Sequence, residues 1–508
     1  MEPRDYLIEE YTRTVCPKCH ANGLRSDDPH AFVDGMLITR NGSVWMKRYC
    51  RTHGESESLY EEDADIWRAR RGWSTPTLQI TPDRADNIGG FPEAYAQGLP
   101  ASHAQHTCIL LLNITERCNF KCPTCYASAL PPDAPGESEG PSIDEIVRTV
   151  ETVIEREGGK LGVLMLSGGE PTIRKDLPEI LARVADLPIT RVMINTNGRR
   201  IARDAAFLKT LEDYRKRIEI YLQYDGLEAE GSLKHRGEDV REEKQCVLQK
   251  LNDSRIFTTL VTTIAKGVND HEVGAMLDLG LSTPYCAGIA FQPMFGSGRA
   301  VAFDPMNRST PTGVIRDLEK QSRVVTAGDF IPLPCSHRDC CDITYFLKTK
   351  QGDWKSIPSL IGRDELAKWI HLVSNTISFD GISDGVTAML KSGALQKVFS
   401  EQLKVGTLDL AKQIASMCNC IPGLNEMLGA IWKSSVDEEA MAKNTFRITV
   451  KMFMDSHTFH EARIRQCCVH TGTFEDDPRR YSFCWRWLFD DAKDAPTDTI
   501  RRDSVKVK

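Results

Sequence analysis

The chain has 508 residues, of which 41% are hydrophobic and 27% charged, and its net charge is −7. This composition is ordinary for a soluble globular protein and gives no support to nucleic acid as the main partner. No apolar run approaches the roughly 20 residues of a membrane span, and the first residues lack a signal-peptide pattern. We therefore expect a cytoplasmic protein of several structural units.

The chain contains 17 cysteines, which point to bound metal rather than disulfides where no secretory signal is present. The N-terminal cysteines Cys16, Cys19 and Cys50 lie on either side of a predicted β-ribbon at residues 31–38 and 43–47. We expect residues 1–75 to form a metal-binding module of the zinc-ribbon or rubredoxin-like type, followed by a linker over 76–105. Such a module can be a structural staple or an electron-transfer site.

The expected ligands of this module are Cys16, Cys19, Cys50 and His53. Two short motifs supply them, and four such ligands suit a tetrahedral site. His20 competes with His53 as the fourth ligand. Because thiolate and imidazole suit both zinc and iron, the sequence leaves the mononuclear metal open.

Six apolar segments separated by helix-length segments predict an alternating arrangement of strands and helices. The predicted strands are residues 107–113, 161–166, 189–194, 217–222, 257–264 and 286–291. Ser142 and Glu145 form a capping box that begins a helix after the first strand, and Asp176 with Glu179 is expected to cap the next helix. This alternation predicts a parallel sheet, and polar residues gather after its strands, where α/β proteins build their sites.

Three cysteines, Cys118, Cys122 and Cys125, follow the first predicted strand at a C-x3-C-x2-C spacing. Three thiolates can hold three corners of a four-iron cluster, whereas a ferredoxin supplies four to a cluster that only carries electrons. The remaining iron is then open to a small molecule. The alternative is a zinc knot, but the neighbouring strands favour the cluster.

This loop resembles the cluster loop of the radical S-adenosylmethionine (SAM) superfamily. The resemblance implies that Cys118, Cys122 and Cys125 are catalytic ligands of a 4Fe-4S cluster whose open iron chelates SAM. Reductive cleavage of SAM then gives a 5′-deoxyadenosyl radical, with ferredoxin or flavodoxin as an electron donor. The implied fold is a partial, six-stranded TIM-like barrel over residues 106–330.

The segment Ser167-Gly168-Gly169-Glu170 follows the second predicted strand. In the superfamily such a segment contacts the SAM amino group, because glycines let backbone carbonyls approach and a carboxylate can receive an ammonium. Further polar residues are expected to contact SAM or substrate, although each could instead be a turn or cap residue. They are Asn195, Gln223, Asp225, Asn269 and Arg299. The resemblance adds Tyr126, the aromatic residue after the third cysteine, as a further cofactor-binding residue.

Eight more cysteines follow residue 330: Cys335, Cys340, Cys341, Cys418, Cys420, Cys467, Cys468 and Cys484. They are enough for two auxiliary 4Fe-4S clusters, or for one with spare cysteines, and their spacing leaves individual ligands ambiguous. We expect residues 331–508 to be a helical, cysteine-rich region. The isolated Cys108, Cys246 and Cys286 are interpreted as core or incidental residues.

The motifs together resemble the group of archaeal tetraether lipid synthases, which is related to class D radical SAM methylases. They include CPxC, CxxHG, LQYDG, FQPMFGSGR, PCSHxxC and CCVH. The resemblance implies C–C bond formation at unactivated sp3 carbons, with cross-linking of lipid alkyl or isoprenoid chains as the leading hypothesis. The alternative is a methylase that uses a methylene-folate or pterin donor. A non-catalytic electron carrier is disfavoured, because it needs neither an open iron nor a Gly-Gly-Glu segment.

Amphipathic helices are predicted between Asp364 and Lys433. Their apolar faces either pack against one another in the core or line a channel for long chains. Because each buried methylene gains roughly 0.8 kcal/mol, such a channel could take a lipid from a membrane surface through transient contact. The expected substrate is therefore a lipid or another small molecule.

Overall fold

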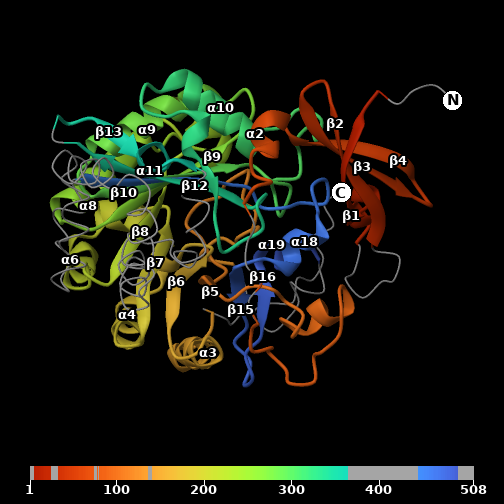
Figure 1. Cartoon of the computed structure of the whole chain (residues 1–508). Coiled ribbons are helices and arrows are strands. Elements are labelled where there is room, and N and C mark those ends of the chain that lie inside the picture. Colours follow the sequence, from red (N-terminus) through yellow and green to blue (C-terminus); the bar gives the residue numbers. More distant parts are fainter. Residues whose placement is uncertain are drawn as a thin grey trace, which may run out of the picture.

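The computed structural model describes residues 5–23, 32–73, 77, 79–134, 140–349, 351–363 and 444–489. Figure 1 shows a small N-terminal sheet beside a large curved sheet that has helices along its outer face. The helices predicted between Asp364 and Lys433, and the predicted ligands Cys418 and Cys420, lie outside the described residues. None of the helices in the described ranges has the length and hydropathy that a bilayer crossing requires.

The N-terminal sheet has four antiparallel strands in the order β1 (Leu7–Val15), β2 (Phe32–Arg40), β3 (Ser43–Cys50) and β4 (Gly54–Glu61). The predicted β-ribbon corresponds to β2 and β3, which are the two central strands. Alternate residues of these strands, Leu37, Val44 and Met46, are fully buried and pack with Trp67 of α2 (Ala64–Arg68). The helix α1 (Pro17–Ala21) connects β1 to the segment before β2.

All six strands predicted for the large sheet are present, each within two residues of its predicted bounds. They are β5 (Ile109–Thr115), β6 (Leu161–Gly168), β7 (Ile189–Thr196), β8 (Ile218–Gln223), β9 (Thr258–Ile264) and β10 (Cys286–Pro293). They pair in parallel and in sequence order. Their carboxyl ends therefore lie along one edge of the sheet.

Residues after 330 extend this sheet at both ends, which the sequence did not predict. The strand β14 (Thr445–Lys451) pairs in parallel with β10, and β15 (Val469–Gly472) pairs in parallel with β5. Antiparallel strands lie outside them, namely β12 (Cys341–Lys348), β11 (Ile331–Pro332) and β13 (Trp354–Ser356) at one end and β16 (Arg480–Ser482) at the other. The six strands are thus the middle of a 12-stranded sheet, and the described C-terminal residues are mainly strands rather than helices.

Eight α-helices of the described chain connect or follow the parallel strands β5 to β10. They are α3 (Ile143–Arg156), α4 (Leu177–Ala185), α5 (Arg199–Arg203), α6 (Ala205–Asp213), α7 (Ala229–Arg236), α8 (Arg241–Asp253), α9 (Val273–Ser282) and α10 (Pro311–Gln321). The capping box at Ser142 and Glu145 is present. Asp176 stands at the start of α4, but its carboxylate pairs with Arg174 at 2.6 Å instead of capping the helix.

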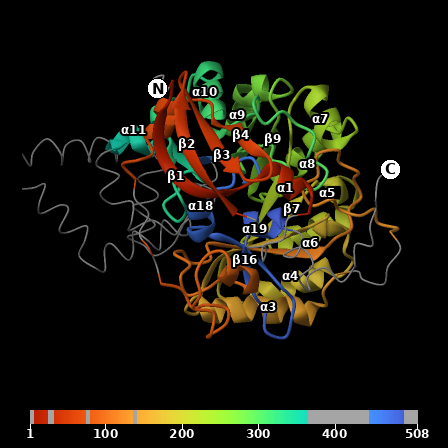
Figure 2. The ribbon, with the colours of Figure 1, turned by 90° about the vertical axis from the view of Figure 1, so that its right-hand side faces the viewer.

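Two apolar cores lie on the two faces of the large sheet. The outer core joins the sheet to its helices, for example Leu164 and Ile220 to Ile146 and Leu181. The inner core includes Met165, together with aromatic residues of the short C-terminal helix α19 (Phe483–Leu488). In Figure 2 the N-terminal sheet lies beside α18 (Glu461–Arg465) and α19. The helix α18 contacts β1, and Trp485 of α19 stacks on Phe32 of β2, so these two helices link the N-terminal sheet to the inner core of the large sheet.

Candidate active site and metal centres

The cysteine loop begins after β5, at the carboxyl edge of the parallel strands. Cys118 and Cys122 are buried, and the backbone N–H of Phe120 donates to Cys118 Sγ at 3.4 Å. Burial, with the carboxylate of Glu170 nearby, raises the pKa of the Cys118 thiol to about 12. The described residues around the adjacent cavity include these two cysteines and Cys125 but no fourth. This donor set fits a four-iron cluster with one open iron.

Arg299 holds the cysteine loop in place. Its Nε donates to the carbonyl of Cys122 at 2.8 Å, and its backbone N–H donates to the carbonyl of Cys125 at 2.9 Å. The preceding Gly298 has φ +57°, and a Cβ there would lie 2.3 Å from the carbonyl oxygen of Tyr126. The guanidinium thus bonds the loop itself, and because Arg299 also lines the cavity, its predicted contact with SAM or substrate stays a prediction.

Gly168 and Gly169 bring the end of β6 against the start of the cysteine loop. Gly168 has φ +132°, and a Cβ on it would lie 2.0 Å from the carbonyl oxygen of Thr115. A Cβ on Gly169 would lie 2.2 Å from the carbonyl oxygen of Arg117. Only glycine fits this close backbone approach, which keeps both backbone segments at the rim of the cavity.

Glu170 is almost fully buried, and its carboxylate accepts four hydrogen bonds. Thr172 donates to Oε1 from its backbone N–H at 3.1 Å and from its hydroxyl at 2.6 Å, and the Thr196 hydroxyl donates at 2.7 Å. The backbone N–H of Asn197 donates to Oε2 at 2.7 Å. The carboxylate therefore joins the loops after β6 and β7, and the predicted contact of Glu170 with the SAM amino group stays a prediction.

Two predicted polar residues, Asn195 and Gln223, line the cavity in a hydrogen-bonded row. Asn195 Nδ2 donates to Ser167 Oγ at 3.0 Å, and Gln223 Nε2 donates to Asn195 Oδ1 at 2.8 Å. Arg236 Nη2 completes the row by donating to Gln223 Oε1 at 3.1 Å. The row fixes the orientation of both amides at the ends of neighbouring strands.

Asp225 and Asn269 lie behind this row and do not line the cavity. Burial alone would raise the pKa of Asp225, but its ion pair with Arg236 at 2.5 Å lowers it. Asn269 Nδ2 donates to the carbonyl oxygens of Asp225 and Thr263 at 2.6 and 2.7 Å. Both residues support the loop after β8, and the predicted contact of either with SAM or substrate stays a prediction.

One part of the cavity wall is aromatic. Tyr126 follows the third cysteine, and its ring centroid lies 5.7 Å from that of Phe295. Phe453 continues the wall, with ring centroids 5.4 Å from Phe295 and 4.2 Å from Phe483. The cavity has a volume of about 140 Å³ and combines this wall with the polar row at the strand ends.

The four ligands predicted in the N-terminal part come together. His53 Nδ1 lies 3.5 Å from Cys16 Sγ, 3.4 Å from Cys19 Sγ and 3.6 Å from Cys50 Sγ. The competing His20 is directed elsewhere, with its Nε2 2.5 Å from the carbonyl oxygen of Leu488. The four side chains fit a tetrahedral metal with His53 as the fourth ligand.

A second cysteine group contains a residue that the sequence analysis set aside. Cys108 lies just before β5, and its Sγ is 3.5 Å from that of Cys335; Cys468 belongs to the same group. Cys335 follows β11 at one end of the large sheet, whereas Cys108 and Cys468 precede β5 and β15 near the other end. The curved sheet thus brings its two ends together at three thiols. Cys108 is buried in an apolar cluster, as expected of a core residue, but it also lies in a thiol group that could hold a metal, which the sequence did not predict because its neighbours are distant in the chain.

Five cysteines line a second cavity inside the curved sheet: Cys340, Cys341, Cys467, Cys468 and Cys484. Arg463 Nε donates to Cys340 Sγ at 3.4 Å, and the backbone N–H of Met454 donates to Cys484 Sγ at 3.3 Å. Hydrogen bonds to sulfur are typical of iron–sulfur sites. Tyr221, Lys451, Phe453 and Phe483 line this cavity and the first one, so the two share a wall. Cys286, by contrast, is buried outside both cavities.

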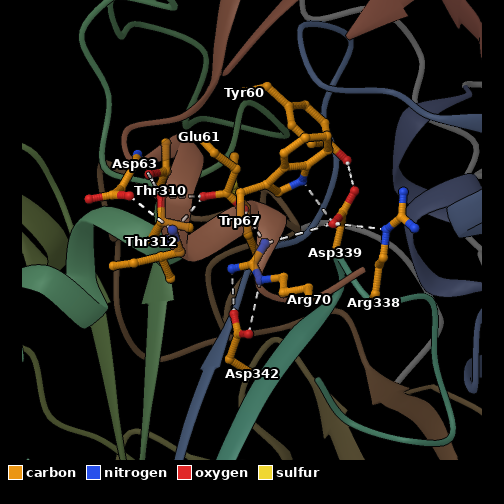
Figure 3. A network of polar contacts seen from close by, with 12 residues as sticks. Tyr60, Glu61, Asp63, Trp67, Arg70, Thr310, Thr312, Arg338, Asp339 and Asp342 are labelled. Atoms are coloured by element: carbon orange, nitrogen blue, oxygen red, sulfur yellow. Dashed lines mark hydrogen bonds and ion pairs between the residues drawn. The ribbon is translucent and has the colours of Figure 1, made fainter. Parts of the chain in front are cut away.

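Arg70 connects the N-terminal part to the strand that carries Cys341 (Figure 3). Its guanidinium pairs with Glu61 at 2.6 Å and with Asp342 at 2.6 Å. The arginine and both carboxylates are almost completely buried. Because a buried charge is costly without its partner, this triad fixes how the two parts dock.

Asp339 completes the network shown in Figure 3. It accepts hydrogen bonds from the Tyr60 hydroxyl at 3.1 Å and from Trp67 Nε1 at 3.0 Å. Burial opposes its ionisation, but His337 and Arg70 lower the pKa of Asp339 to about 2. Asp339 and Asp342 flank the adjacent pair Cys340-Cys341, so side chains of the N-terminal part hold both ends of that pair.

Two family models match parts of the chain. Residues 112–280 match the radical SAM superfamily, and residues 8–62 match the HMPTM N-terminal zinc ribbon domain. A 7,8-dihydro-6-hydroxymethylpterin dimethyltransferase of Methanocaldococcus jannaschii is 27% identical over 506 residues, which cover 94% of this chain and 93% of that protein.

Other relatives match smaller parts. A GTP 3′,8-cyclase of Klebsiella pneumoniae subsp. pneumoniae is 37% identical over 112 residues, covering 22% of this chain and 32% of the cyclase. Among solved structures, a radical SAM methyltransferase from Sphaerobacter thermophilus is 10% identical with a TM-score of 0.31, covering 63% of this chain and 76% of that chain.

Proposed function

Because this chain is a radical SAM protein with an N-terminal zinc ribbon domain, we propose that it forms C–C bonds by adding a one-carbon unit to a reduced pterin. The observation that carries the proposal is the extent of the similarity to the pterin dimethyltransferase. It spans 94% of this chain, whereas the cyclase shares only 22%. The similarity thus covers the zinc ribbon and the C-terminal cysteines as well as the cluster loop.

The radical SAM domain takes a 4Fe-4S cluster and SAM, which together supply the 5′-deoxyadenosyl radical. The chain's own residues position and enclose this chemistry. Cys118, Cys122 and Cys125 would hold the cluster, and the backbone at Gly168 and Gly169 approaches the same cavity. The aromatic wall gives the cavity an apolar side, and exclusion of water at such a surface would protect a reactive intermediate from side reactions.

The second cavity supports a C–C bond-forming reaction rather than simple SAM cleavage. Its cysteines, with the group at Cys108, support auxiliary clusters in addition to the first one. Because Tyr221 and Phe453 line both cavities, a group held by Cys340, Cys467 or Cys484 would lie on the far side of a shared wall from the reacting carbon. We propose that this arrangement controls the carbon-centred radical after it forms.

A second candidate function is cross-linking of lipid chains, as in the tetraether lipid synthase group. The observation in its favour is the apolar surface between the cysteines of the second cavity, formed by residues such as Met193, Leu333 and Ile343. An alkyl chain would gain free energy against such a surface. Transient contact with a membrane surface, and reduction by ferredoxin or flavodoxin, belong to this candidate as proposals.

The two candidates are separated by offering both substrates to the anaerobically reconstituted protein with SAM and dithionite. One reaction contains 7,8-dihydro-6-hydroxymethylpterin and a methylene-folate donor, and the other contains vesicles of a diether lipid. We expect mass spectrometry to detect methylated pterin and unchanged lipid. Cross-linked lipid with unchanged pterin would replace the first proposal by the second.

A further inference from the structure

Lys451 is a basic residue on the wall between the two cavities, at the end of β14. Its Nζ lies 5.1 Å from the ring centroid of Tyr221 and 6.0 Å from that of Phe453. No carboxylate of the described residues forms an ion pair with it, whereas Arg236 pairs with Asp225 and Arg447 with Glu219. The Lys451 ammonium therefore has donors available to a molecule in the cavity.

Gln292, at the end of β10, lines the first cavity beside the same tyrosine. Its Nε2 donates to the Tyr221 hydroxyl at 3.0 Å, which fixes the amide and leaves the amide oxygen as an acceptor. Among the described residues no donor bonds that oxygen. An oriented acceptor and a cationic donor thus contact one tyrosine from two different strands.

The aromatic wall adjoins this pair. Phe453 lies beside both Lys451 and Phe483, with centroids 4.2 Å apart for the two phenyl rings. Aromatic surfaces bind flat rings by offset stacking or edge-to-face contact. The site therefore offers a stacking surface with one donor and one acceptor at its edge.

We infer that Lys451 and Gln292 form a subsite for the lactam edge of a flat heterocycle. The ring carbonyl oxygen accepts a hydrogen bond from Lys451, and the neighbouring ring N–H donates to the amide oxygen of Gln292. This inference rests on the proposed function, since the reduced pterin carries such an edge. The competing role for Lys451 is that of a counter-charge to Cys341 in the second cavity, since the two side chains interact electrostatically, whereas Arg463 bonds Cys340.

The test compares the wild-type protein with Lys451→Met, using 7,8-dihydro-6-hydroxymethylpterin and an analogue in which an amino group replaces the ring carbonyl. We expect Lys451→Met to weaken binding of the pterin by about 10- to 100-fold, the usual worth of a hydrogen bond to a charged group. The wild type should bind the analogue more weakly by a similar factor or more. Lys451→Met should discriminate less than the wild type, because only the contact between Gln292 and the ring N–H then separates the two compounds. Lys451→Arg should restore the discrimination.

Lys348→Met is the matched control, because Lys348 makes a similar contact with Trp354 at 5.4 Å but lines neither cavity. It should leave the affinity for both compounds unchanged. SAM affinity and iron content are measured in every variant. If Lys451→Met loses iron, Gln292→Leu tests the other half of the subsite and should weaken pterin binding while keeping the iron.

Each remaining outcome overturns a defined statement. Unchanged discrimination in Lys451→Met, with a shifted reduction potential of an auxiliary cluster, would make Lys451 a counter-charge and overturn the subsite. Pterin binding to the wild type that no variant alters would overturn the subsite alone. Absence of pterin binding to the wild type would overturn both the subsite and the proposed substrate.

Discussion

At the scale of single residues, the sequence predicted which residues carry the chemistry, but it did not predict which residues they contact. The spacing of Cys118, Cys122 and Cys125 is a property of the chain itself, so it could be predicted without a fold. The partners of Arg299 and Glu170 depend on loops that meet only in the folded protein. Hydrogen-bond partners between distant loops are therefore the part of the site that the sequence could not supply.

Cys122→Ala should abolish reductive cleavage of SAM, because two thiolates cannot hold the cluster with an open iron. Cys122 lies in a loop outside the strands, so secondary structure should be unchanged by circular dichroism. The measurement is 5′-deoxyadenosine formed under dithionite, with Cys246→Ala, an exposed cysteine on α8, as the control. Wild-type amounts of 5′-deoxyadenosine from Cys122→Ala would contradict the assignment of the loop.

Glu170→Gln should lower stability more than it lowers SAM affinity. Glu170 accepts hydrogen bonds from backbone N–H groups and hydroxyls through both carboxylate oxygens. In the glutamine variant an NH2 group replaces one of these oxygens and cannot accept. A buried donor left without its acceptor costs about 1–3 kcal/mol. Thermal unfolding and a calorimetric SAM titration measure the two effects. A large loss of SAM affinity with unchanged unfolding would instead place this carboxylate on the SAM ammonium.

At the scale of elements, local patterns predicted the strands that are continuous in sequence. Each of β5 to β10 is an apolar run followed by polar or glycine residues, so all six were found within two residues. β14 and β15 were missed because their partners, β10 and β5, lie far away in the chain. The same long-range pairing brings Cys108 to Cys335, which no local pattern indicates.

Cys108→Ala should remove auxiliary iron, whereas Cys286→Ala should not. Both cysteines are buried at the start of strands, but only Cys108 lies in a group of thiols. We expect iron analysis after anaerobic reconstitution to show less iron in Cys108→Ala, with the cluster at the first site still able to cleave SAM. Equal iron in the two variants would leave Cys108 as a core residue after all.

At the scale of the whole molecule, buried charged residues hold the N-terminal zinc ribbon part against β12, the strand that begins at Cys341. Arg70 pairs with Glu61 of its own part and with Asp342 of β12, so the two parts share one ionic network. The sequence predicted the module and its ligands, but nothing in it indicated that Arg70 reaches a residue 272 positions away. The structure thereby links the zinc ribbon to the second cavity.

Arg70→Met should destabilise the docking and reduce auxiliary iron while zinc remains bound. Removing one partner of a buried ion pair costs about 3–5 kcal/mol, because Asp342 and Glu61 would then lie buried without their counter-charge. The zinc-to-iron ratio after reconstitution is the measurement. Arg40→Met, which breaks a more exposed pair with Glu57, is the control and should leave the ratio unchanged. An unaltered ratio in Arg70→Met would show that the docking does not support the cysteines.

The central claim is that the 5′-deoxyadenosyl radical made at the three-cysteine loop is used to methylate a reduced pterin. The most direct test measures methyl groups gained by 7,8-dihydro-6-hydroxymethylpterin against 5′-deoxyadenosine in the same reaction. The account predicts that methylated pterin and 5′-deoxyadenosine rise together in fixed proportion, and that both are lost in Cys122→Ala. Accumulation of 5′-deoxyadenosine by the wild type with an unchanged pterin mass would contradict it.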